Sequence, residues 1–121
     1  MTVEREFEEF LQELFEPVGG VSLRRMFGGL GVFRHGLMFG LVADGRLCLK
    51  VDDKNRQDYE NECSGEWSYD GKGKPVKMGY WYVPERLMDE PEEFAIWAER
   101  AFDAAVRIDQ AKPPSQRKLK L

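Results

Sequence analysis

The sequence is poor in the residues that build metal sites and disulfide scaffolds. It has two cysteines, Cys48 and Cys63, with no Cys-x-x-Cys pair and no cysteine and histidine at zinc-ligand spacing. Two cysteines are too few for a disulfide framework, and the missing spacing argues against a zinc site. We expect free, unreactive thiols in the reducing cytoplasm. A single disulfide between them is the alternative that the sequence leaves open.

The sequence also lacks long apolar runs and an excess of positive charge. No stretch approaches the roughly 20 apolar residues of a membrane-spanning helix, and no charged segment with an apolar core marks a signal peptide. We therefore expect a cytoplasmic protein with no membrane partner. The formal net charge is -4, which is not the usual electrostatic footprint of a DNA-binding domain. Acidic residues crowd the first 16 positions and basic residues close the chain.

Groups for catalysis are equally scarce. The one histidine, His35, precedes Gly36 at an expected hairpin turn, where a side chain is exposed, and no neighbour in sequence would orient it as a base. The many carboxylates fall on expected helix faces, where they are solvated. We identify no catalytic residues, no metal ligands and no cofactor site, and we expect a protein that is not an enzyme.

What the chain does have is enough apolar residues for one domain. Its 121 residues are 42% hydrophobic, which fits a single core. We place this domain at residues 1–109. Residues 110–121 contain two prolines and several basic residues without an apolar period, and we expect them to form a mobile tail.

Apolar residues at helical spacing predict three helices. The first ends before Pro17 and Gly19-Gly20, the second spans about 53–62 with Asp52 as its cap, and the third opens at Asp89 with Glu92 placed for a capping box. The stripe of the first helix is Val3, Phe7, Phe10, Leu11, Leu14 and Phe15; that of the third is Phe94, Trp97, Ala98, Ala101, Phe102, Ala105 and Ile108; Tyr59 anchors the second.

Short β-forming segments separated by turn signals predict antiparallel strands. They lie near 22–27, 30–35, 37–43 and 46–51, followed by one strand with Trp67 and Tyr69 and another from Val76 to Tyr82. His35-Gly36 and Asp44-Gly45 suit tight hairpins. Because tight turns join antiparallel neighbours, we predict an α+β fold: an antiparallel β-sheet flanked by helices.

The stretch "RRMFGGLGVF", residues 24–33, combines two arginines with three glycines. A phosphate-binding loop needs a helix after the glycines, and here β pattern continues, so we predict a turn or bulge. Consecutive strand residues point to opposite faces. We therefore expect one of Arg24 and Arg25 to face solvent and the other to pair with a carboxylate against the packed face. An anion or nucleic-acid role for them is the second interpretation.

The aromatic residues after position 66 resemble a stacking platform for single-stranded nucleic acid. Alternation points Tyr80 and Tyr82 one way and Trp81 the other, so a core or subunit-interface role is the favoured interpretation. We predict a homodimer whose interface includes Trp81 or its strand neighbours. The candidate partner- or anion-binding residues are Arg24, Arg25, Lys72, Lys74, Lys77 and Trp81.

Three segments together resemble a known family. They are "RRMFGGLGVF", "GLMFGLVADGRLCLKVDDKNRQDYE" at 36–60 and "GKGKPVKMGYWYVPERLMDEPEEFAIWAERA" at 71–101. In this order and spacing they look like the N-terminal domain of TfoX, also called Sxy, a bacterial competence regulator. The resemblance covers roughly residues 10–107.

The resemblance implies a fold similar to type III secretion chaperones, commonly dimeric, with no established enzymatic activity. It also implies a role in competence gene expression and DNA transformation, as a co-activator with a cyclic-AMP receptor protein. Full-length regulators carry a second, helical C-terminal domain, and we expect the polar tail to stand in its place here.

Our leading hypothesis is a non-enzymatic regulatory or adaptor domain that acts through protein contacts, with the transcription machinery as a candidate partner. The alternatives are a nucleic-acid-binding module that uses the basic residues and tail, and a small-molecule-binding domain with a pocket between sheet and helix.

Overall fold

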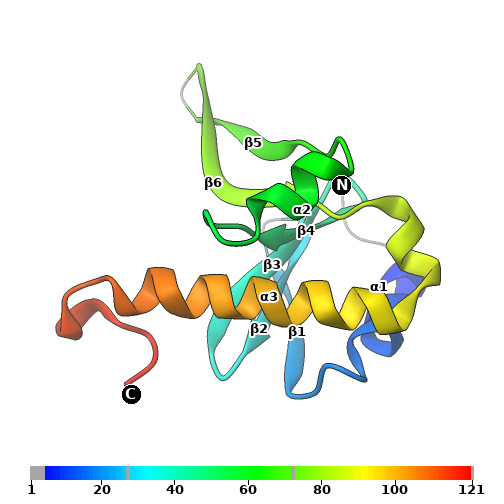
Figure 1. The fold of residues 1–121 in the computed structure, drawn as a ribbon, viewed down its shortest axis with the longest axis horizontal. Helices are drawn as coiled ribbons and strands as arrows, with labels where there is room; N and C mark the ends of the chain where they lie inside the picture. The colour runs from blue at the N-terminus through cyan, green and yellow to red at the C-terminus, as the bar shows by residue number, and fades with distance from the viewer. Residues whose placement is uncertain (1–4, 27, 72, 121) are drawn as a thin grey trace.

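The computed structural model describes residues 5–26, 28–71 and 73–120, in which runs of strands are separated by helices (Figure 1). Over those residues the α-helices are α1 (Arg5–Phe15), α2 (Arg56–Asn61) and α3 (Pro91–Gln110). The strands are β1 (Val21–Met26), β2 (Gly29–Arg34), β3 (Leu37–Ala43), β4 (Arg46–Lys50), β5 (Glu66–Gly71) and β6 (Lys74–Tyr82). Two short 3-10 helices, η1 (Glu85–Asp89) and η2 (Pro114–Gln116), flank α3.

The strands form one antiparallel sheet in the order β1-β2-β3-β4-β6-β5, which confirms the predicted class. Both predicted two-residue turns are present. His35 and Gly36 have φ of 54° and 78°, and Asp44 and Gly45 have φ of 54° and 72°. Two successive positive φ angles give a turn the same twist as the right-handed twist of its flanking strands. This match explains why these sequences close the β2–β3 and β3–β4 hairpins.

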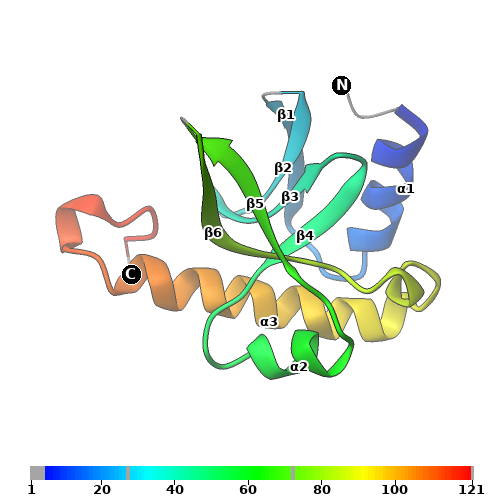
Figure 2. The same cartoon turned by 90° about the horizontal axis from the view of Figure 1, so that it is seen from above.

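All three α-helices pack on one face of the sheet, which we call the inner face (Figure 2). The long helix α3 runs across it, and α1 and α2 fill the space beside α3. The core between the layers joins Leu11 and Phe15 of α1, Tyr59 of α2 and Phe94 of α3 to inward strand residues such as Leu49. Among the described residues, no helix covers the opposite face of the sheet.

A bulge in the β2–β3 ladder decides which β3 residues enter the core. The pairing register shifts between Val32 and Phe33, where Val32 faces Gly40 and Phe33 faces Met38. The extra residue, Phe39, is fully buried among the core side chains, whereas Met38 and Leu41 belong to a cluster on the other face. An unpaired bulge residue re-aims its neighbours, so β3 supplies apolar side chains to both faces.

The predicted starts of two helices are wrong. Helix α2 begins at Arg56, because the Asp52 carboxylate accepts the Lys54 N–H at 3.0 Å and two bonds from Arg107 at 2.7 and 3.0 Å. These contacts make Asp52 part of a turn fastened to α3. Helix α3 begins at Pro91, because Asp89 closes η1, and Glu90 stands at the cap without a side-chain bond.

Of the described residues in the predicted apolar stripes, two lie at the surface and not in the core. Phe10 is 36% exposed and stacks on Phe7, at 6.3 Å between ring centroids. Ile108 is exposed near the end of α3, where Asp109 takes the buried position. Val3 lies outside the described residues.

The C-terminal tail folds back along the end of α3. The Asp109 carboxylate accepts the N–H groups of Lys118 and Leu119 at 2.8 and 3.0 Å, and these bonds lower its pKa. The Gln110 amide donates to the Leu119 carbonyl at 2.9 Å, and Leu119 packs against the core. The mobility of residues 110–121 stays a prediction. The structure adds these contacts between the tail and the end of α3.

Candidate interaction surface

The glycine-rich stretch forms a hairpin between β1 and β2. Met26 pairs with Gly29 at its end, and Gly28 has a φ of 78°. A β-carbon on Gly29 would lie 2.2 Å from the Val42 carbonyl oxygen, so glycine is required where β3 passes close to β2. Strand β2 follows the turn directly, and the predicted bend is confirmed.

Arg24 and Arg25 point to opposite faces, as predicted. Arg25 lies on the helix side and pairs with Glu8 of α1, at 2.7 Å between nitrogen and oxygen. Arg24 lies on the other side, with its guanidinium 5.0 Å from the centre of the Phe33 ring. The two arginines therefore do not form one basic patch.

The remaining candidate residues are also separated. Trp81 pairs with Leu49 and packs against the inner core, 6.1 Å from the Tyr59 ring centroid. Its neighbours Tyr80 and Tyr82 belong to the opposite cluster, so the predicted alternation is confirmed. Lys74 and Lys77 are exposed on β6 in its hairpin with β5, and Lys72 lies outside the described residues.

The face opposite the helices, which we call the outer face, gathers apolar, aromatic and cationic side chains from all six described strands. Leu41, Cys48 and Tyr80 are buried at its centre. The face is made of Arg24, Phe33, Met38, Leu41, Ala43, Arg46, Cys48, Lys50, Trp67, Tyr80 and Tyr82. Trp67 stacks on Tyr69 of the same strand, at 5.7 Å and 28° between rings, and Tyr69 is 44% exposed.

Two cations of this face, Arg46 and Lys50, were missed from the sequence. The Arg46 guanidinium lies 4.1 Å from the centre of the Tyr82 ring, and the Lys50 ammonium lies 4.4 Å from that of Tyr80. The available signal was the alternation of Arg46, Cys48 and Lys50 with leucines in β4, which marks a mixed second face. The sequence could not supply their ring partners, because β4 and β6 are neighbours only in the folded sheet.

Burial shifts the pKa values of ionisable side chains on the outer face. It raises the pKa values of Cys48 and Tyr80 to about 12, so both groups are neutral at physiological pH. It also lowers the pKa of Lys50, and the nearby charge of Lys112 lowers it further. The Lys50 ammonium donates to the Met78 carbonyl at 2.7 Å. Lys50 is thus held in a fixed place over its ring.

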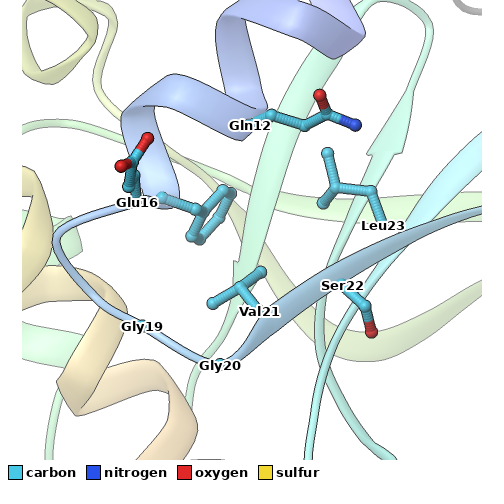
Figure 3. Close-up of a pocket in the computed structure, with 8 residues that line it drawn as sticks. Gln12, Glu16, Gly19, Gly20, Val21, Ser22 and Leu23 are labelled. Atoms are coloured by element: carbon cyan, nitrogen blue, oxygen red, sulfur yellow. The ribbon is translucent and has the colours of Figure 1, made fainter.

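A separate pocket lies between the end of α1 and the start of β1 (Figure 3). Its volume is about 480 Å³. Leu23 and Gln12 lie across the hollow from one another, Gly19 and Gly20 lie in the loop that borders it, and Phe15 and Val21 also line it. Of the lining residues in the described part of the chain, Glu16 alone is ionisable, and Gln12 and Ser22 add uncharged polar groups to the apolar side chains.

His35 is exposed at its turn, as predicted, with its ring 6.2 Å from that of Phe102. Within residues 5–26, 28–71 and 73–120, no group of three or more histidine, cysteine, aspartate or glutamate side chains is placed to hold a metal ion. No helix in these ranges combines the length and the apolar character that crossing a bilayer requires.

We predict that the two cysteines differ widely in reactivity. Cys48 is fully buried with a raised pKa, whereas Cys63 is exposed, and the structure leaves both free. Iodoacetamide should label Cys63 in the folded protein and Cys48 only after unfolding, because the thiolate is the reactive form. Mass spectrometry of timed samples measures both. Equal labelling, or an intramolecular disulfide after purification under alkylating, non-reducing conditions, would contradict the prediction.

Comparison with known proteins agrees with the resemblance seen in the sequence. The family described as the TfoX N-terminal domain matches residues 13–105, which includes all six strands, α2 and most of α3. Among curated proteins, none matches the chain.

Proposed function

Because the chain belongs to the TfoX N-terminal domain family, we propose that it is a non-enzymatic adaptor domain that acts through protein contacts in the control of transcription. In this proposal it works in the cytoplasm and promotes competence gene expression together with a cyclic-AMP receptor protein, as the family resemblance implies.

The observation that carries the proposal is the outer face. One face of the sheet is packed by helices, while the other presents ordered aromatic and cationic side chains that no described helix covers. Surface aromatics and arginines are the side chains most enriched where proteins bind each other. Supporting this, the pocket beside β1 has no pair of acid and base groups among its lining residues in the described part of the chain.

Titration with labelled duplex DNA at increasing salt separates an adaptor from a nucleic-acid-binding module. We expect weak binding with a shallow salt slope, because the 22 acidic residues outnumber the 18 lysines and arginines and give a net charge of -4. Chemical crosslinking in cells should, in parallel, recover the domain joined to transcription proteins. Tight DNA binding with a steep salt slope would replace the proposal with the nucleic-acid alternative.

We further propose that the domain is a homodimer formed through β1. Within the described residues, β1 is a terminal strand of the sheet with a neighbour on one side only, and such an edge can pair with another chain. Pairing of two β1 strands about a two-fold axis would extend the sheet and leave both outer faces accessible.

Light scattering at micromolar concentration should therefore give twice the 14.0 kDa chain mass. A monomeric mass would contradict the dimer. The change Trp81→Glu cannot test the interface by itself, because Trp81 is partly buried against the core, and a charge at this position would also destabilise the domain. An interface test must use β1.

A further inference from the structure

We propose that the outer face binds an extended acidic segment of a protein partner, in which carboxylates and apolar side chains take turns at every second residue, so that both lie on the same side of the segment. This inference rests on the proposed adaptor function and names the partner's chemistry. It follows from how the cations are held, from what lies between them and from which other ligands the face would reject.

Each of the three cations on this face is supported by an aromatic ring. Arg24 lies over Phe33, Arg46 over Tyr82 and Lys50 over Tyr80, at 5.0, 4.1 and 4.4 Å from the ring centres. A cation–ring contact restricts a long flexible side chain and leaves its outward N–H groups available. The planar guanidinium group of an arginine held in a fixed position can donate two parallel hydrogen bonds to the two oxygens of a carboxylate.

The spacing of the cations fits a peptide strand. Arg46 and Lys50 are four residues apart on β4, which separates their α-carbons by about 13 Å. Arg24 lies on β1, three strands away, or about 14 Å. An extended segment advances about 3.3 Å per residue, so carboxylates four residues apart reach two cations.

Between the cations lies an apolar floor for the side chains that stand two residues from each carboxylate, on the same side of the segment. Leu41 and Tyr80 form its buried centre, and Met38, Ala43 and Trp67 are partly exposed around it. Two acids lie near the face: Asp44 in the β3–β4 turn, and Glu66, whose carboxylate accepts the Gly79 N–H at 3.1 Å. Lys112 of the tail adds positive charge near Lys50, so the cations outnumber these acids.

Charge and ring access argue against two other occupants. A second copy of this chain, packed face to face, would bring arginines against arginines. Single-stranded nucleic acid binds by stacking bases on free ring faces, and here cations already cover Phe33, Tyr80 and Tyr82. The carboxylates of a short acidic peptide would pair directly with these cations. A short peptide would also lie away from the acidic helices on the other face of the sheet.

Fluorescence anisotropy tests the proposal on the full chain, with a labelled extended peptide of about a dozen residues in which aspartate and leucine take turns at every second position and serine fills the positions between them. We expect saturable binding that the double change Arg24→Gln with Arg46→Gln weakens by about tenfold or more. Glutamine keeps part of the stem over the ring but removes the charge. The matched control is Arg56→Gln, an exposed arginine of α2 that pairs with Asp53 away from the outer face.

The same peptide with asparagine in place of aspartate tests the contact without altering the protein, and it should bind at least about tenfold more weakly. Equal binding of both peptides, no binding of the aspartate peptide, or equal loss in the Arg56→Gln control would overturn the inference. So would tighter binding of a labelled oligothymidylate that the double change abolishes, which would assign the face to nucleic acid. Recovery of transcription proteins by the double variant, as by the unmodified chain, would refute the inference and leave the adaptor function standing.

Discussion

Replacing Phe39 by alanine should lower the free energy of unfolding by about 3–5 kcal/mol. Phe39 is fully buried, and its ring meets those of Phe15 and Phe102 edge to face, at 6.1 and 5.5 Å between centroids. It thus joins β3 to both α1 and α3. Chemical denaturation followed by circular dichroism measures the loss, which would be a large part of the stability of a domain this size.

The matched control is Phe10→Ala. Phe10 is 36% exposed and contacts the ring of Phe7 on the same helix, so its removal opens no cavity in the core. We expect a loss below about 1 kcal/mol. Equal losses in the two variants would show that Phe39 does not join the layers as described.

Gly29→Val should be the most damaging change in the glycine-rich hairpin, with a loss of about 2–3 kcal/mol or more. A β-carbon at this position meets the Val42 carbonyl oxygen at 2.2 Å, which is backbone and cannot turn away. The strand must shift, and the β2–β3 hydrogen bonds weaken with it. Gly28→Val should cost about 1 kcal/mol or more, because Gly28 has a φ of 78°. Thermal unfolding measures both.

Gly31→Ala is the control for this series. Its added β-carbon would meet the Met26 sulfur at 2.6 Å and the Phe33 ring at 2.7 Å, both of which belong to side chains that can rotate. We expect a smaller loss than for Gly29→Val. A Gly29→Val protein that kept its melting temperature but lost affinity for a phosphate ligand would contradict the structural role of the hairpin.

The roles of Gly29 and Phe39 differ in how far the sequence predicts them. A bend at Gly28-Gly29 was predictable, because the positive φ of a turn is a local property. The burial of Phe39 in the core beside a partly buried Met38 on the other face was not, because it depends on a bulge set by pairing with β2. The same division holds for the candidate surface: alternation separated Trp81 from Tyr80, but only the pairing of β6 with β4 placed Arg46 over Tyr82.

The sequence by itself determined the α+β class, the strand segments, the two hairpin turns and the family, because period-two alternation, glycine at positive φ and short motifs are written in adjacent residues. Only the tertiary structure decided three arrangements. Asp52 binds Arg107 and does not cap α2, the helices share one face of the sheet, and three cations lie over aromatic rings on the other face. Those arrangements join segments far apart in the chain, and their free energy comes from packing and charge pairing that no local pattern records.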